Sequence, residues 1–496
     1  MNKNNLTSCL VCLLITISGL ASASLAPPNL TIDAQELDAV RTVAYTIEAT
    51  HTSNGNPVWE GYDISTSPLI ISFANGHVYA FNFHSSNPRW HALPISHSTV
   101  LYSSDDPEGI SKIPMNPSYV LEGQSAFLYQ LDLIDGPSYL PFLVLIHERF
   151  HQFQFQNFKP GIRSGGYQDH LNAQNLALVQ LEELILTDFL KAEDAVTKMD
   201  RIKDFVAIRE LRFRDLNPSS IHWEQDQQRM EGLAEYVSIK MYEAFPLIPD
   251  YDGPLHMQTM MEMYSKDENI ADRAIKHRHY GVGASIAIAL DFLKAQDWKA
   301  QTQQGAPLDT LLMQNVKLNP KDLISRVEKI KNEYGFTTIY AAINAKINSY
   351  QKEIDDIIND FQEQPAVEVA LFKPRGMGMS GGGTNLQMFH LADGGTLSVD
   401  NSSVNTTPDN TWKFSLTNMP VVIQKRTGEI DFKVEKNLQI VINNKSFNLE
   451  QLLKSNREFV FNKISWKGGC CEFYSEEYPG TLSVRDNKIY IMFHVT

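Results

Sequence analysis

The most informative segment of the chain reads Leu143-Val-Leu-Ile-His147-Glu148-Arg-Phe-His151-Gln-Phe153. Its composition predicts an apolar helix, on which residues four apart lie about 40° from one another at roughly 100° per residue. His147 and His151 can therefore bind one Zn2+ together, with Glu148 beside the first histidine. A carboxylate at that position can accept a proton from a water that zinc has activated. The spacing predicts metal-dependent hydrolysis, and the alternative is a helix that carries two histidines by chance.

Composition limits the classes of protein that the sequence can encode. The chain has 496 residues, of which 43% are hydrophobic, so we expect a globular protein of two or three domains. A net charge of −15 disfavours nucleic acid and anionic membranes as partners. After the first residues, no stretch approaches the ~20 apolar residues of a membrane span. We therefore expect no nucleic-acid partner and no membrane span, while the oligomeric state is not indicated.

The first 23 residues have the pattern of a secretory signal peptide. Lys3 precedes an apolar run, and Ala21-Ser-Ala23 is typical of a cleavage site. The pattern predicts a secreted or periplasmic protein. The mature chain then keeps only the adjacent pair Cys470 and Cys471, whose redox state is open. The fold should not depend on a disulfide framework.

Hydrophobic periodicity predicts an α+β fold. A helix over 32–49 is followed by strands at 68–73, 78–83 and 126–132, which form a small N-terminal sheet before the histidine helix. A sheet that leads into such a helix is typical of a zincin. Longer segments with helical spacing then complete a mainly helical catalytic domain; they are 172–191, 195–216, 219–244, 255–264, 281–295, 320–334 and 339–361.

The composition changes near Pro365, where helical signals stop. The glycine-rich segment 376–383 indicates a flexible connection, and short β-rich segments alternate with Asn, Gly and Asp turns after it. This alternation predicts a small all-β C-terminal domain, built as a sandwich or barrel. The expected division is a signal peptide at 1–23, a zincin-like catalytic domain at 24–365 and a β-rich accessory domain at 366–496.

A catalytic zinc needs a third protein ligand and an open position for water. Glu231 is the best candidate, because Gly232 and Ala234 beside it allow its helix to press against a neighbour. Glu235 shares its helix face at i+4 and can orient a ligand imidazole. The alternative for this segment is a charged, solvated helix face. Lower-ranked alternatives for ligands or their partners are His222, Glu224 and Asp226.

These motifs resemble the gluzincin zinc peptidases, which include the aminopeptidase N and glycyl aminopeptidase families and, more distantly, the thermolysin-like enzymes. Those families carry the phrase N-E-G-[FL]-A-x-Y, and Glu231-Gly-Leu-Ala-Glu-Tyr matches it after Met230 in place of Asn. Tyr280-Gly-Val-Gly-Ala284 is similar to their Y-x-K-G-A, with Val282 in place of Lys. The resemblance implies that Glu231 is a zinc ligand and that Tyr280 stabilises an oxyanion.

The chain also departs from these families. His151 and Glu231 are 80 positions apart, so two predicted helices would be inserted between ligands. The G-x-M-E-N phrase that binds a free amine is absent before His147, so exopeptidase specificity is not implied. His277, Arg278 and His279 could contact an oxyanion or a substrate carboxylate, although a basic cluster before a helix is the commoner explanation.

The sequence therefore predicts an exported zinc peptidase that acts on a peptide or protein substrate. His147, His151 and Glu231 would bind Zn2+, Glu148 would be the general base, and Tyr280 would stabilise the oxyanion. Two alternatives remain at this point: a zinc hydrolase of a non-peptide amide or ester, and a binding protein that keeps the fold without turnover.

Overall fold

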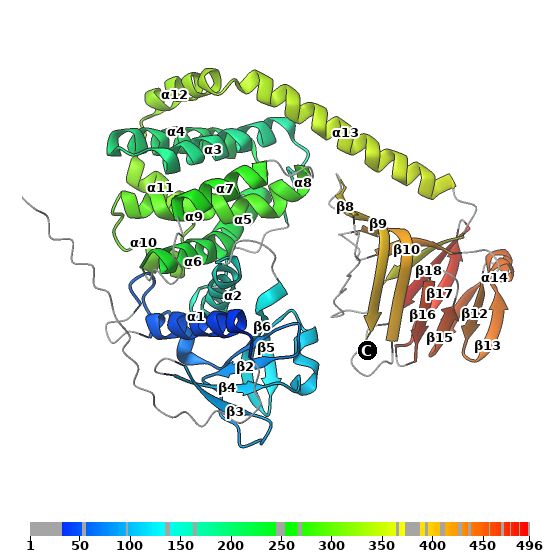
Figure 1. Cartoon of the computed structure of the whole chain (residues 1–496). Coiled ribbons are helices and arrows are strands. Elements are labelled where there is room, and N and C mark those ends of the chain that lie inside the picture. The colour runs from blue at the N-terminus through cyan, green and yellow to red at the C-terminus, as the bar shows by residue number, and fades with distance from the viewer. Residues whose placement is uncertain are drawn as a thin grey trace, which may run out of the picture. The chain divides into compact units, whose positions relative to one another are not determined.

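The computed structural model in Figure 1 is α+β, with many helices and two sheets. It describes residues 32–494, except 52–55, 96–97, 134–138, 162–165, 245–252, 266–269, 364–366, 373–386, 392–394, 407–411, 425–428, 435–437, 456, 468–470, 477 and 486. Four features of the sequence analysis lie outside the described residues: the predicted signal peptide, the composition change at Pro365, the glycine-rich segment 376–383 and Cys470. Two compact units are present, Met1–Leu145 with Phe245–Pro249 and Ile146–Ala244 with Asp250–Thr496.

The first unit combines one helix with a six-stranded sheet. Helix α1 (Ala34–Thr50) confirms the prediction over 32–49, and the Asp33 side chain caps its start by accepting from the Gln35 amide at 2.8 Å. The predicted hairpin is also confirmed, since β1 (Leu69–Ser72) pairs antiparallel with β2 (Val78–Phe81) across a turn at Gly76, where φ is 91°. The sheet order is β3-β4-β2-β1-β6-β5, with only β1 and β6 parallel among these pairs.

The other elements of this unit are short. They are η1 (Ile64–Thr66), β3 (His91–Ile95), β4 (Ser98–Ser103), η2 (Pro107–Lys112), β5 (Met115–Leu121), β6 (Gln124–Gln130) and η3 (Leu131–Leu133). Strand β6 confirms the strand expected over 126–132, shifted by two residues toward the N-terminus. Small residues and β-branched or aromatic side chains from these strands form a buried core, as the pattern of the sequence predicts.

The second unit begins within α2 (Leu140–Asn157), the helix that carries the histidines. Each predicted helix is present within a few residues of its expected bounds. The helices are α3 (Ala173–Lys191), α4 (Ala195–Asp215), α5 (Pro218–Gln227), α6 (Leu233–Ala244), α7 (Gly253–Ser265), α8 (Ile270–Asp272), α9 (Arg278–Phe292), α10 (Trp298–Gln303), α11 (Leu308–Val316), α12 (Pro320–Glu333) and α13 (Phe336–Glu363).

Two π-helical turns interrupt this helical region, and neither was predicted. The turn η4 (Gln228–Gly232) joins α5 to α6, so the segment expected as one helix over 219–244 is continuous but locally widened. The turn η5 (Arg273–His277) leads directly into α9. Single π-helical turns inside helices are rare and occur frequently at functional sites.

Strands follow the last long helix. Among the described residues they form one twelve-stranded sheet with one short helix. This region is β-rich as predicted, but the sheet is not closed into a barrel, one of the two expected arrangements. Its main order is β13-β12-β15-β16-β10-β11-β7-β18-β17-β14, with β8 on β9 and β9 on β10. The elements are β7 (Val367–Phe372), β8 (Gln387–His390), β9 (Thr396–Thr406), β10 (Trp412–Gln424), β11 (Glu429–Val434), β12 (Gln439–Ile442), β13 (Lys445–Asn448), α14 (Leu449–Ser455), β14 (Glu458–Phe461), β15 (Ile464–Lys467), β16 (Cys471–Ser475), β17 (Gly480–Arg485) and β18 (Lys488–Phe493).

Within the described part of the chain, no helix has the length and apolar character that crossing a membrane requires. The most apolar helix, α9, is instead buried among the other helices of its unit.

Candidate metal centre

Helix α2 places the two histidines on one face. His147 is buried and His151 is half-buried, and their rings lie 4.8 Å apart between centroids. Apolar residues at neighbouring positions, such as Ile146 and Phe150, are fully buried and fix the rotation of the helix. The histidine face is therefore set by core packing on the adjacent face.

The turn η4 brings Glu231 to these histidines. Its close approach to α9 depends on two glycines, because a Cβ on Gly232 would lie 2.4 Å from the Gly283 Cα. A Cβ on Gly283 would in turn lie 2.5 Å from the Gln228 carbonyl oxygen. Side chains at these positions would force η4 and α9 apart, so the glycines determine where Glu231 lies.

Three potential ligand atoms form a nearly equilateral triangle. The His147 and His151 Nε2 atoms are 3.1 Å apart, and Glu231 Oε2 lies 3.4 Å from the first and 3.2 Å from the second. Two ligands at the usual zinc distances and a tetrahedral angle are separated by about 3.3 Å. These separations mean that the group could hold a metal ion.

Other side chains contact the Nδ1 atoms of both histidines and orient the two imidazole rings. His147 Nδ1 lies 3.3 Å from Glu235 Oε2, and His256 Nε2 lies 3.3 Å from the other oxygen of that carboxylate. His151 Nδ1 lies 2.7 Å from Gln154 Oε1. Each neutral ring that donates from Nδ1 to such an acceptor keeps the Nε2 lone pair for a metal. The sequence had indicated Glu235 for this role, but not Gln154 or His256.

The electrostatics of the group favour an added cation. Burial alone would lower the pKa of His147, but Glu231 and Glu235 raise it to about 9. Burial would raise the pKa of Glu231, yet the two histidines hold it well below its ordinary range. Among the residues that the structure describes, no lysine or arginine pairs with either carboxylate. The site thus favours a positive charge, carried by a proton or by a metal.

Tyr280 and Glu148 lie at the same site. The Tyr280 ring stacks on the His147 ring at 5.5 Å between centroids and 14° between planes. Tyr280 is half-buried in the first turn of α9. Glu148 follows His147 on α2 and is also half-buried, so its carboxylate is not sealed in the core.

Glu224, an alternative ligand in the sequence analysis, lies elsewhere. Its carboxylate is fully buried and accepts from Arg212 Nη1 at 2.6 Å, while Arg278 Nη1 lies at 3.2 Å. Burial would raise the pKa of Glu224, but the two guanidinium groups hold it well below its usual range. Glu224 is therefore already paired and is not available as a ligand in this arrangement.

Glu224 belongs to a larger set that we name the ion cluster. In it, Glu182 accepts from Arg209 Nε at 2.7 Å and from Arg278 Nη2 at 2.7 Å, and all of these groups are buried. Arg209 also donates to Gln228 Oε1 in η4 at 3.2 Å, which connects the ion cluster to the turn that carries Glu231. Carboxyl and guanidinium groups are matched in number; the members are Glu182, Glu183, Glu224, Asp309, Arg209, Arg212, Arg273 and Arg278.

The remaining candidates do not join the ligand triangle. Asp226 pairs with Arg229 at 3.2 Å, and His222 lines a small hollow beside it. His279 is buried and lies 3.1 Å from the Ala274 carbonyl, and burial together with the nearby Arg278 lowers its pKa to about 3. The suggested contact of Arg278 and His279 with an oxyanion is thus wrong for these two residues, while His277 is exposed.

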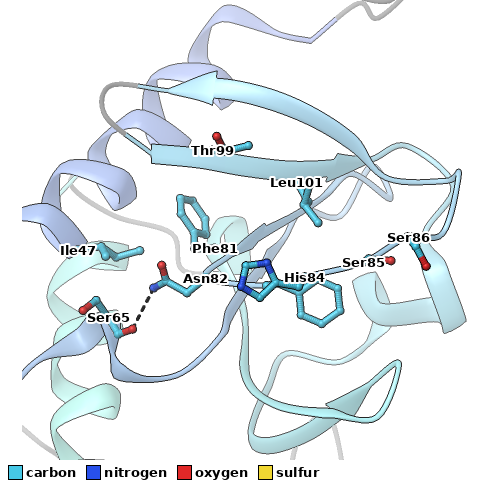
Figure 2. Close-up of a pocket in the computed structure, with 10 residues that line it drawn as sticks. Ile47, Ser65, Phe81, Asn82, His84, Ser85, Ser86, Thr99 and Leu101 are labelled. Atoms are coloured by element: carbon cyan, nitrogen blue, oxygen red, sulfur yellow. Dashed lines mark hydrogen bonds between the residues drawn. The ribbon is translucent and has the colours of Figure 1, made fainter.

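A separate hollow of about 650 Å³ opens in the first unit (Figure 2). Polar and apolar side chains both line it, and the Asn82 side-chain amide, which Figure 2 labels, donates to the Ser65 carbonyl at 3.2 Å. None of the residues of the ligand triangle lines this hollow, so its presence does not bear on the metal centre.

Comparison with known proteins does not extend these observations. No protein-family model, no curated protein and no solved structure matches the chain. The argument for a function therefore depends on the geometry and chemistry of the site itself.

Proposed function

We propose that the chain is an exported zinc-dependent peptidase of the gluzincin type, with a zincin-like catalytic domain. The observation that carries the proposal is the ligand triangle of His147, His151 and Glu231 beside uncompensated carboxylates. Two imidazoles and one carboxylate with an open position are the donor set of catalytic zinc sites. The substrate would be a peptide or protein, as the resemblance of the motifs implies.

The residues of the chain would divide the chemistry among them. A bound zinc ion supplies a Lewis acid that acidifies water and polarises a carbonyl group. Glu148 accepts the proton of the attacking water and delivers it to the leaving amine. Tyr280, held against His147 by stacking, donates its hydroxyl hydrogen to the oxygen on which negative charge develops. Glu235 and Gln154 keep the ligand rings in the orientation that binding requires.

Metal analysis combined with one conservative substitution tests this proposal. Purified mature protein should contain about one zinc per chain and should cleave a peptide library. Glu148→Gln should keep the zinc and lose about 10²- to 10⁴-fold in kcat, because it removes a proton acceptor and not a ligand. Glu328→Gln, at an exposed position on α12, is the matched control and should change neither quantity.

Three results would contradict the proposal. Iron in place of zinc would indicate a different use of the same donor set. If the protein cleaves esters and leaves peptides uncleaved, its substrate is not a peptide. Zinc binding without any hydrolysis in the parent would favour a binding protein.

A further inference from the structure

Gln154 lies one turn after His151 on α2 and is almost completely buried, with 1% of its surface exposed. Its side-chain amide has three partners. Oε1 lies 2.7 Å from His151 Nδ1, and Nε2 donates to the Arg229 carbonyl at 3.2 Å and to the Met230 carbonyl at 3.0 Å. One planar group therefore connects a ligand imidazole to the two peptide groups that precede the ligand Glu231.

The partners determine which way the amide faces. A backbone carbonyl can only accept, so both contacts with η4 require the NH2 end of Gln154. The oxygen end must then face His151, which has to donate from Nδ1. The neutral His151 ring is consequently protonated on Nδ1, and its Nε2 lone pair faces Glu231 Oε2 at 3.2 Å. A flipped amide would leave two carbonyls facing an oxygen, so the tautomer of His151 is set by η4 through Gln154.

We propose that Gln154 is a positioning residue that fixes His151 and Glu231 relative to each other. This inference depends on the proposed metal centre. It assigns to one side chain two effects that are usually separate, namely orientation of a ligand ring and placement of the turn that carries another ligand.

Two substitutions separate these effects. Gln154→Met removes both, and should weaken zinc affinity by about 10- to 100-fold, the usual cost of losing a partner of a ligand. Gln154→Glu keeps an acceptor for His151 but places a carboxylate against two carbonyl oxygens, so it should also weaken zinc binding. Asn157→Ala is the matched control, since Asn157 is an exposed amide on the same helix that donates only to the Phe153 carbonyl.

Zinc affinity is measured by competition with a chromogenic chelator, and the visible absorption of Co2+-loaded protein is recorded for each variant. Both Gln154 variants should show a changed Co2+ spectrum, whereas a change in stability alone would leave that spectrum as in the parent. If Gln154→Met has the zinc affinity and the Co2+ spectrum of the parent, the inference is wrong. If Gln154→Glu has them, Gln154 only orients His151 and does not place the turn that carries Glu231. If Gln154→Met does not fold, Gln154→Glu alone decides. A parent that binds no zinc contradicts the proposed function instead.

Discussion

The metal centre and the ion cluster contain the same kinds of residue and differ in how their charges are matched. In the ion cluster, Glu182 and Glu224 each have at least two guanidinium partners within 3.2 Å. In the metal centre, Glu231 and Glu235 have only histidines as ion-pair partners among the described residues. The carboxylates of the ion cluster are paired with arginines of the protein itself. With its histidines neutral, the metal centre carries two negative charges from Glu231 and Glu235, which two protons or one divalent metal ion would neutralise.

This difference explains why neighbouring glutamates on one helical segment have different roles. Glu224 and Glu231 are separated by two helical turns; Glu224 is fully buried and Glu231 is half-buried. What distinguishes them is the side chains of other helices that face them, Arg212 and Arg278 in one case and His147 and His151 in the other. The carboxylates of the ion cluster are thus paired within the protein, whereas the group of His147, His151 and Glu231 could hold a metal ion.

The largest effect should come from removing one carboxylate from each group. Glu224→Gln leaves the buried Arg212 and Arg278 to share Glu182, with one negative charge fewer around them, which should destabilise the protein by about 3–5 kcal/mol. Glu231→Gln removes a charge whose ion-pair partners are histidines, which can lose their proton, so the metal-free protein should lose less stability than Glu224→Gln does, while zinc affinity is lost. Urea unfolding and chelator competition on both variants test this prediction. Equal loss of stability in the two variants would remove the distinction between the groups.

Two tyrosines provide the next comparison. Tyr280→Phe at the metal centre should lower kcat by up to about 10²- to 10³-fold, because a donor to developing charge is lost, with little change in zinc content. Tyr167→Phe in contact with the ion cluster removes a donor at 3.0 Å from Glu224 and an acceptor of Asn175 at 2.7 Å. It should cost about 1–3 kcal/mol of stability and leave kcat unchanged. Thermal unfolding and steady-state kinetics on the same preparations distinguish these outcomes, and the reverse pattern would mean that Tyr280 has only a structural role.

Zinc itself should stabilise the parent but not the ligand variants. At a free concentration of 100 times Kd, binding to the folded state alone adds about 2.7 kcal/mol. Thermal unfolding should therefore shift upward with zinc in the parent and in Glu224→Gln, and should not shift in His147→Ala. An equal shift in His147→Ala would place the bound metal at another site.

Much of the fold could be predicted from the sequence, because the helices and the first hairpin depend on local periodicity. The histidine spacing, Glu231 and Glu235 were also found, since helical repeats place such residues on one face. Other features depend on contacts between distant segments. The local sequence does not predict that Glu224 pairs with Arg278, or that Gln154 makes its three contacts. It does not predict the π-helical turns either, because they have no distinct residue pattern. The domain division at 365 and the secretory signal stay predictions.

As the pH falls, the metal centre should lose zinc first, and the ion cluster should lose its contribution to stability at a lower pH. Histidine ligands must be neutral to bind metal, and the carboxylates raise the pKa of His147 to about 9, so protons compete with zinc from neutral pH downward and zinc should be released before the carboxylates are protonated. The carboxyl group of Glu224 has a folded pKa well below its ordinary value, because Arg212 and Arg278 outweigh the effect of burial. Its contribution to stability is therefore present above the unfolded pKa of about 4.3 and is lost only as the pH falls further, toward the folded pKa.

A pH interval should thus exist, between about 5 and 4.3, in which the protein has lost zinc and remains folded. Zinc content after dialysis and far-UV circular dichroism, measured on the same samples from pH 7 to pH 3, test this order. Glu224→Gln is the control, because it cannot lose that ionised carboxylate: it should start less stable and lose less stability between pH 4.3 and pH 3. Loss of zinc and of helical signal in one step would mean that the fold depends on the metal, and that the ion cluster does not stabilise the helical region by itself.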